Sequence, residues 1–447
     1  MPVLFIGVFM AALDTAVIAP VIPALREAFA LDNRAVGLVM IVFILFSLSS
    51  TALMANLGDR HGRRPVYLAS ISLFALGSLV IALSPSFWLI VVGRAIQGVG
   101  GGGIIPTASA VIGDALPPKE RGRALGLIGA TYGMAFVLGP PLAGLLMVVA
   151  SWHWIFLANL PIAAIVLFLG ARALPVQKRA GVLPPLDWPG IVAVFLMLSA
   201  LVLGITRVAD GLAGVVLWPW LLAAAAALLL LLVAIERRAR QPTIPLTLFA
   251  NRQLALAYLL TAGAGFGMGS VIFLTSIATL AHGVARDHAG FVLLPMVICS
   301  MVGSMGSGRL LNRLGARTLV MIGFVLLAVG YAASALPGIG LTGFLLATMP
   351  VGLGVGVVVS GALRTIAIDE APVAVRGAAQ GLINIFTSIG TLLSAAAIGA
   401  LADYGGGGVH GFGIAYGVVA ALMLVMLLVA FGLRAESAAL KSADPAL

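Results

Sequence analysis

Apolar blocks of about 20 residues, separated by short charged or Pro/Gly-rich breaks, recur along the whole sequence. A helix needs about 20 mainly apolar residues to cross a hydrocarbon core about 30 Å thick, so each block has the length of a membrane span. Composition agrees, because 62% of the 447 residues are apolar and only 9% are charged. In soluble domains, about 45–50% of the residues are apolar and about 25% are charged. The sequence therefore predicts an all-α polytopic membrane protein.

The blocks predict fourteen spans. They lie at 3–23, 35–57, 66–84, 87–112, 122–149, 153–173, 188–207, 215–235, 254–281, 288–311, 317–337, 341–365, 374–401 and 411–433. The first block carries Asp14 and lacks a cleavage site of small residues, so we expect a true span and not a signal peptide.

The distribution of basic residues predicts the orientation. Most of the 25 Lys and Arg residues fall on one side if both termini are cytoplasmic, as expected for a multi-pass protein of the inner or plasma membrane. This placement also explains the net charge of +10 without a nucleic-acid partner.

Two segments of the chain indicate an internal duplication. Residues 121–128 and 376–383 share six of eight positions, and Asp114 and Asp369 keep the same offset of 255. Repeats of this kind are common in transporters. They predict an N-terminal six-helix half, an inserted helix pair with its loops, a C-terminal six-helix half and a cytoplasmic tail, at residues 1–173, 174–253, 254–433 and 434–447.

The loop after the second span reads Ala-Asn-Leu-Gly-Asp-Arg-His-Gly-Arg-Arg over residues 55–64. A tight turn needs glycine there, and Asp59 suits the positive end of the helix that begins near Ala374. Arg63 is placed to bridge Asp59 and Asp114. We expect a latch that closes the inner side, although the charges would also serve to set topology alone. Its residues are Asp59, Arg60, Gly62, Arg63, Arg64 and Asp114.

This loop resembles the signature loop of the major facilitator superfamily, with Ala55 at the leading glycine. The resemblance implies a major facilitator fold with two pseudo-symmetric six-helix halves. The second copy of the loop has Asn312 and Ala316 at charged positions, so we expect a weaker latch there.

Span four contains Arg94-Ala-Ile-Gln97-Gly-Val-Gly, which resembles a second pattern of the superfamily. An arginine within a span is costly in lipid and is a functional candidate by default. The alternative is that Arg94 reaches the outer interface. The glycines that follow give a smooth helix face for close packing.

Span five resembles the motif that marks antiporters in this superfamily through Gly126, Gly139, Pro140 and Gly144. Ala135 and Ala143 stand where the motif has glycine. A generic kinked packing helix is the alternative, because proline removes a backbone donor and permits a bend.

Span one, with Asp14 and Pro23, resembles the corresponding motif of the fourteen-span drug:proton antiporters, and Ala16 and Ala19 replace its polar residues. Asp14 is the carboxylate nearest the middle of any predicted span, which makes it the leading proton-coupling residue, with Arg94 as a charge that would tune it.

We therefore expect a secondary transporter that exports lipophilic, often cationic drugs in exchange for protons, as a monomer without cofactor or metal. Possible residues lining its cavity are Gln97, Tyr132, Phe136, Asn159, Asn384 and Phe386. Alternatives are transport of a lipid, sugar or anionic metabolite with Arg94 as the anion contact, and a channel or receptor. An intramembrane enzyme is disfavoured, because Cys299 stands alone and the five histidines lie in loops or at span ends.

Overall fold

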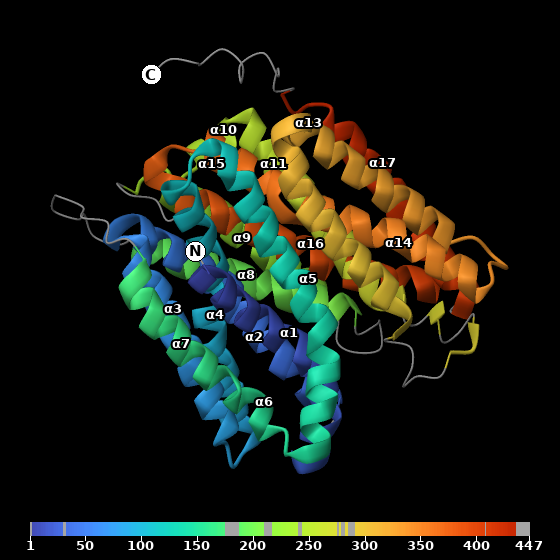
Figure 1. Cartoon of the computed structure of the whole chain (residues 1–447), viewed down its shortest axis with the longest axis horizontal. Coiled ribbons are helices and arrows are strands. Elements are labelled where there is room, and N and C mark those ends of the chain that lie inside the picture. The colour runs from blue at the N-terminus through green and yellow to red at the C-terminus, as the bar shows by residue number, and fades with distance from the viewer. Residues whose placement is uncertain are drawn as a thin grey trace.

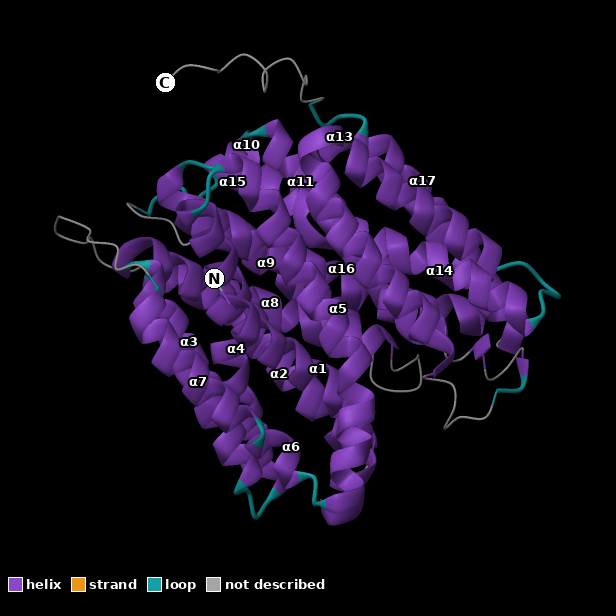
Figure 2. Cartoon of the chain, in the orientation of Figure 1, coloured by secondary structure: helices purple, strands orange, loops and turns teal. Residues whose placement is uncertain are grey.

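The computed structural model describes residues 2–29, 33–174, 187–209, 217–239, 244–274, 277–278, 282–284, 291–406 and 408–434. In these ranges every regular element is a helix (Figure 2). Apolar spans form helices because a backbone surrounded by lipid must satisfy its hydrogen bonds within the segment.

The N-terminal bundle corresponds to the first six predicted spans. Its helices are α1 (Pro2–Phe29), α2 (Asn33–His61), α3 (Arg63–Ala82), α4 (Phe87–Ala115), α5 (Pro118–Val149), α6 (His153–Leu157) and α7 (Asn159–Ala173). Along the chain, the N-terminal bundle is followed by α8 (Trp188–Ala209), α9 (Trp218–Glu236) and α10 (Thr247–Ala250), which precede the C-terminal bundle.

The C-terminal bundle is less regular. It contains α11 (Arg252–Ser270), η1 (Val271–Phe273), η2 (Phe291–Leu293), α13 (Leu294–Ser334), α14 (Leu341–Val357), the π-helix η3 (Val358–Ala362), α15 (Leu363–Glu370), η4 (Val373–Val375), α16 (Arg376–Tyr404) and α17 (Gly408–Ala430).

Helix α13 joins two spans that the sequence predicts separately. The break between them survives as a reversal at Gly315, whose φ of 77° lies in the left-handed region that favours glycine. Among the described residues, ten helices are long and apolar enough to cross a membrane, and Pro2–Ile18 and Leu341–Val357 are shorter apolar helices. The predicted count of fourteen spans is larger than the number of these helices, and it stays a prediction.

The two bundles meet along two seams. Helices α5 and α13 lie side by side on one face (Figure 1), and α2 packs against α16 at the other seam. Helix α8 contacts both α2 and α16, while α9 packs mainly on α8. The N-terminal half and the C-terminal half are thus in contact through helices of each.

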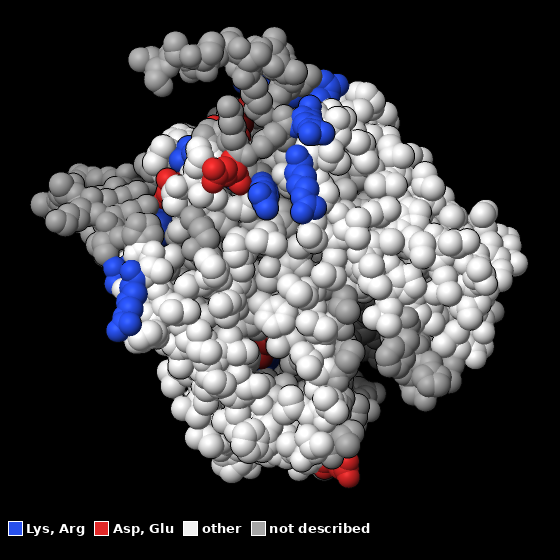
Figure 3. Space-filling view, in the orientation of Figure 1, with Lys and Arg blue, Asp and Glu red and all other residues white. Residues whose placement is uncertain are grey.

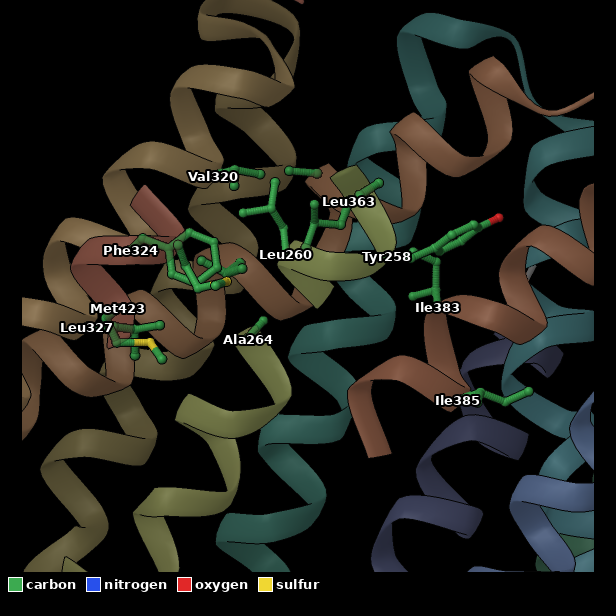
Figure 4. Close-up of a cluster of buried hydrophobic side chains, with 14 of the residues drawn as sticks. Tyr258, Leu260, Ala264, Val320, Phe324, Leu327, Leu363, Ile383, Ile385 and Met423 are labelled. Carbon is green, nitrogen blue, oxygen red and sulfur yellow. The ribbon is translucent and has the colours of Figure 1, made fainter. Parts of the chain in front are cut away.

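Each bundle has its own hydrophobic core, as expected for close-packed interiors. Tyr67, Phe74 and Ile104 are fully buried in the N-terminal bundle. In the C-terminal bundle, Phe324, Leu327 and Met423 pack together with Tyr258 at the edge of the group, its hydroxyl pointing away from them (Figure 4). The cores hold the helices rigidly enough to position buried polar groups.

Candidate functional site

Asp14 lies in α1 and its side chain is completely buried. Its Oδ2 accepts a hydrogen bond of 2.7 Å from Nη1 of Arg94 on α4, whose side chain is 1% exposed. Arg94 therefore does not reach the outer interface. The two residues that the sequence marked separately form one buried ion pair.

Two amides complete the surroundings of the carboxylate. Nε2 of Gln97 donates to Asp14 Oδ1 at 2.8 Å, and Nδ2 of Asn159, on α7, donates to the same oxygen at 3.2 Å. Both amides also donate to the hydroxyl of Ser78 on α3, at 2.9 and 3.1 Å. We call Asp14, Ser78, Arg94, Gln97 and Asn159 the buried polar cluster.

The guanidinium of Arg94 is held on several sides. Its Nη1 also donates to Gln97 Oε1 at 2.6 Å, its Nε donates to the carbonyl of Val39 at 3.2 Å, and its centre lies 4.2 Å from the ring centroid of Phe43. A cation over an aromatic face is attracted by the ring quadrupole. Arg94 is thus fixed by α2 as well as by α1.

The buried ion pair carries an energetic cost that its surroundings must offset. Taking a carboxylate and a guanidinium out of water costs several kcal/mol per ion, which their attraction offsets only with good geometry and further hydrogen bonds. Asp14 has these, because Arg94, Gln97 and Asn159 all donate to its two oxygens. The ion pair thus joins α1 to α4.

The predicted latch residues lie together at the opposite end of α2 from Asn33. Oδ1 and Oδ2 of Asp59 accept from the backbone N–H groups of Gly377 and Ala378, each at 3.2 Å, at the start of α16. Arg63 forms ion pairs with Asp59 and, through Nε at 3.3 Å, with Asp114. A carboxylate at a helix start is stabilised by the unpaired N–H groups there.

The remaining predicted latch residues differ in their contacts. Gly62 has a φ of 96° between α2 and α3 and Arg60 is buried, whereas Arg64 donates to the carbonyl of Ala171 on α7 of its own bundle. We call Asp59, Arg63, Asp114 and Arg376 the latch cluster, and this end of the molecule the latch end.

The sequence reasoning missed part of this end. Arg376 lies 3.6 Å from Asp114 and Arg121 lies 3.2 Å from Asp369, so each half pairs an arginine with an aspartate of the other half. The sequence did contain a signal for these pairs, because Asp114 and Asp369, like Arg121 and Arg376, are 255 positions apart. When two duplicated elements face each other, a contact from the first to the second is expected to have an equivalent from the second to the first. Gly377 was also missed, although a Cβ there would lie 2.6 Å from Arg63 Nη1 and 2.8 Å from Asp59 Oδ1.

The antiporter-like motif is described in part. A Cβ on Gly126 would lie 2.9 Å from the Cα of Gly308, and one on Gly139 would lie 2.6 Å from the Cβ of Ala16, two residues after Asp14. These glycines let α5 approach α13 and α1 closely. The side chains of Pro140, Tyr132 and Phe136, and the surroundings of Gly144, lie outside the described part of the structure.

The possible lining residues divide into two groups. Gln97 and Asn159 belong to the buried polar cluster. Phe386 stacks on Tyr258 with ring centroids 5.5 Å apart, and Asn384 Oδ1 accepts from Nη2 of Arg364 at 2.7 Å. Of the four lining residues whose side chains the structure describes, only Gln97 and Asn159 belong to one hydrogen-bonded cluster.

The fold and the buried charges define a polytopic helical membrane protein. The sequence matches the family model of the Major Facilitator Superfamily over residues 4–395 and again over 257–446. The chain belongs to this superfamily, and it is a transporter of small molecules and not an enzyme.

Known proteins resemble it over most of its length. An uncharacterized MFS-type transporter, YfiU of Bacillus subtilis, is 32% identical over 401 residues, which cover 87% of this chain and 76% of YfiU. Multidrug resistance protein 3 of Bacillus subtilis is 29% identical over 337 residues, covering 73% of this chain and 64% of that protein, so the match spans less than two thirds of it. The human organic anion transporter MFSD10 (TETRAN) has a TM-score of 0.72 at 18% identity, covering 96% and 98%.

Proposed function

We propose that this chain is a proton-coupled antiporter that exports lipophilic, often cationic drugs by alternating access. The observation that carries the proposal is Asp14, a completely buried carboxylate within an apolar helix, whose oxygens accept hydrogen bonds from Arg94, Gln97 and Asn159. Ionisable residues inside the membrane are expensive and mark proton or substrate pathways. The similarity to a relative named for multidrug resistance supports the choice of substrate class.

The geometry of the buried polar cluster supports proton exchange. With the latch contacts formed, Asp14 is paired with Arg94. Neutralisation of Asp14 would weaken this pair, and the remaining contacts of Arg94 would be those with Gln97, Val39 and Phe43. The packing of α1 on α4 would change as a result. A conformation in which Asp14 is accessible from the other side would then release the proton, because restored pairing favours the charged form.

The substrate class follows from what the rest of the bundle offers. Helices α11, α13, α14 and α17 contain no Asp or Glu. The rings of Phe249 and Phe386, which are at least partly exposed and pack against the buried ring of Tyr258, are apolar and polarisable. Such surface binds lipophilic compounds and attracts cations weakly through ring faces.

The proposal includes a topology. The chain has fourteen spans, with α8 and α9 as an inserted pair between halves 1–173 and 254–433, the connecting region at 174–253 and a tail at 434–447. It acts as a monomer in the plasma or inner membrane with both termini cytoplasmic. Support comes from α8, which packs on α2 and α16, and from α9, whose apolar side chains such as Leu230 and Trp220 are exposed.

Asp14→Asn tests the proposal in inside-out vesicles that carry an imposed proton gradient. The expected result is loss of gradient-driven drug uptake, because the side chain no longer takes up a proton. Glu27→Gln is the matched control, since Glu27 is an exposed carboxylate of the same helix. Unchanged transport by Asp14→Asn would remove Asp14 from the coupling role.

A second candidate is transport of a lipid or anionic metabolite. It is favoured by Arg94, a buried cation that an anion would seek. However, Asp14 and Gln97 already occupy Nη1 of its guanidinium. Cations and anions compared in parallel for substrate-stimulated proton release distinguish the two candidates.

A further inference from the structure

Exposed arginines gather at the latch end of the seam between α5 and α13. Arg123 of α5 and Arg309 and Arg313 of α13 are all exposed. Among the described residues, the ion pairs of this end are formed by other arginines, namely Arg63, Arg121 and Arg376. Arg123, Arg309 and Arg313 have no carboxylate of a described residue within 4 Å. Figure 3 shows basic side chains at this end, with an acidic side chain beside them, above a belt almost free of charge.

The arginines come from different halves, and the seam brings them together. Gly126 packs directly on Gly308, and Ser304 Oγ donates to the carbonyl of Gly126 at 2.8 Å. Arg123 precedes Gly126 by three residues and Arg309 follows Gly308. Since a helix turn has 3.6 residues and rises about 5.4 Å, both arginines lie within about one turn of this contact.

Closing this end therefore places like charges near each other across the seam. Like charges disfavour the arrangement unless an anion lies between them. Next to the arginines, the surface of the seam is apolar and exposed, with Leu127 on α5 and Met305 and Leu310 on α13. A ligand that fits both features has an anionic head group and apolar chains.

We propose that the latch end of the α5–α13 seam is a binding site for an anionic phospholipid. Its phosphate accepts hydrogen bonds from Arg123, Arg309 and Arg313, and its acyl chains lie along Leu127 and Met305. Basic pockets between membrane helices bind such head groups. Because the arginines belong to both halves, the lipid binds best when the latch is closed and stabilises that state. This inference does not depend on what the transporter carries.

The test uses the purified full chain in detergent. It is titrated with short-chain phosphatidylglycerol and with phosphatidylcholine of equal chain length, and bound lipid is counted by native mass spectrometry. We expect phosphatidylglycerol to bind about tenfold more tightly. The triple variant Arg123→Gln/Arg309→Gln/Arg313→Gln should lose this preference.

The control removes the same charge elsewhere. Arg172, Arg237 and Arg238 are exposed arginines of α7 and of the segment after α9, and their triple change to Gln should keep the preference. The single variant Arg309→Gln, which alters one exposed side chain, should lose part of it and gives an answer even if the triple variant does not fold. Spin labels across the seam should report more of the short-distance state in nanodiscs that contain phosphatidylglycerol.

Three results would overturn the site. The first is equal affinity of the unmodified chain for both lipids. The second is an equal loss of preference in the two triple variants, which would show that only net charge matters. The third is displacement of the lipid by inorganic phosphate at the same concentration, which would indicate a site for free anions.

Discussion

The two halves share a duplicated sequence pattern, yet their buried polar chemistry differs. The N-terminal bundle encloses an ion pair, Asp14 with Arg94, and three neutral partners. In the C-terminal bundle, the buried Arg364 donates to Gln380 and Asn384, and buried hydroxyls such as those of Thr261 and Ser270 donate to carbonyls of their own helix. The N-terminal bundle thus buries a carboxylate together with an arginine, and we propose that this half carries the proton.

The largest expected effect comes from breaking the buried ion pair. Arg94→Ala leaves Asp14 buried without its counter-charge, which should lower the free energy of unfolding by about 3–5 kcal/mol. Denaturant unfolding in detergent measures it. Arg237→Gln, at an exposed arginine, should change the value by less than about 0.5 kcal/mol. Equal effects of the two variants would mean that the pair contributes nothing specific.

The latch cluster offers a contrast between a buried and a partly exposed contact. Gly377→Val pushes a side chain against Arg63 and Asp59, so we expect the latch end to open, with a shift of about 1–3 kcal/mol in the conformational equilibrium. Asp369→Asn removes a pair in which Asp369 is 41% exposed, and it should shift the equilibrium by about 0.2–1 kcal/mol.

Accessibility of a cysteine introduced at the latch end measures both shifts. Cys299 is partly buried and is first replaced by serine. If Asp369→Asn opened the latch end as far as Gly377→Val, the latch cluster would not be the main contact that closes it.

Two tyrosines give the smallest contrast. The hydroxyl of Tyr67, in the N-terminal bundle, donates to the carbonyl of Val3 at 3.1 Å, whereas the buried hydroxyl of Tyr258 has no hydrogen-bond partner among the described residues. Tyr67→Phe should cost about 0.5–1.5 kcal/mol, and Tyr258→Phe should be nearly neutral. Thermal unfolding of the two variants checks the order. A larger loss for Tyr258→Phe would indicate a polar partner for that hydroxyl.

The sequence predicts most of the helices, because span length and charge breaks follow directly from the bilayer. It predicts less about helix ends and irregular turns. The predicted span 341–365 is broken by a π-helix at Val358–Ala362, and α11 gives way to a 3-10 turn at Val271. Local packing decides such features, and hydropathy carries no signal for them.

Contacts within the site were harder to predict than its members. Asp14 and Arg94 stand out as charges inside apolar blocks, but 80 positions separate them and only packing of α1 on α4 brings them together. Gln97 shares a helix face with Arg94, yet its bond to Asp14 depends on that packing. Ser78 was missed, because a serine in an apolar helix usually bonds to its own backbone, as Ser78 also does to the carbonyl of Phe74.

The central claim is that Asp14 carries the transported proton. The most direct measurement is proton release by the purified protein when a lipophilic cation is added in weakly buffered solution, compared between the unmodified chain and Asp14→Asn. The account predicts a release from the unmodified chain that rises with substrate and disappears in the variant, while substrate binding by the variant persists. Equal proton release from both proteins would contradict it.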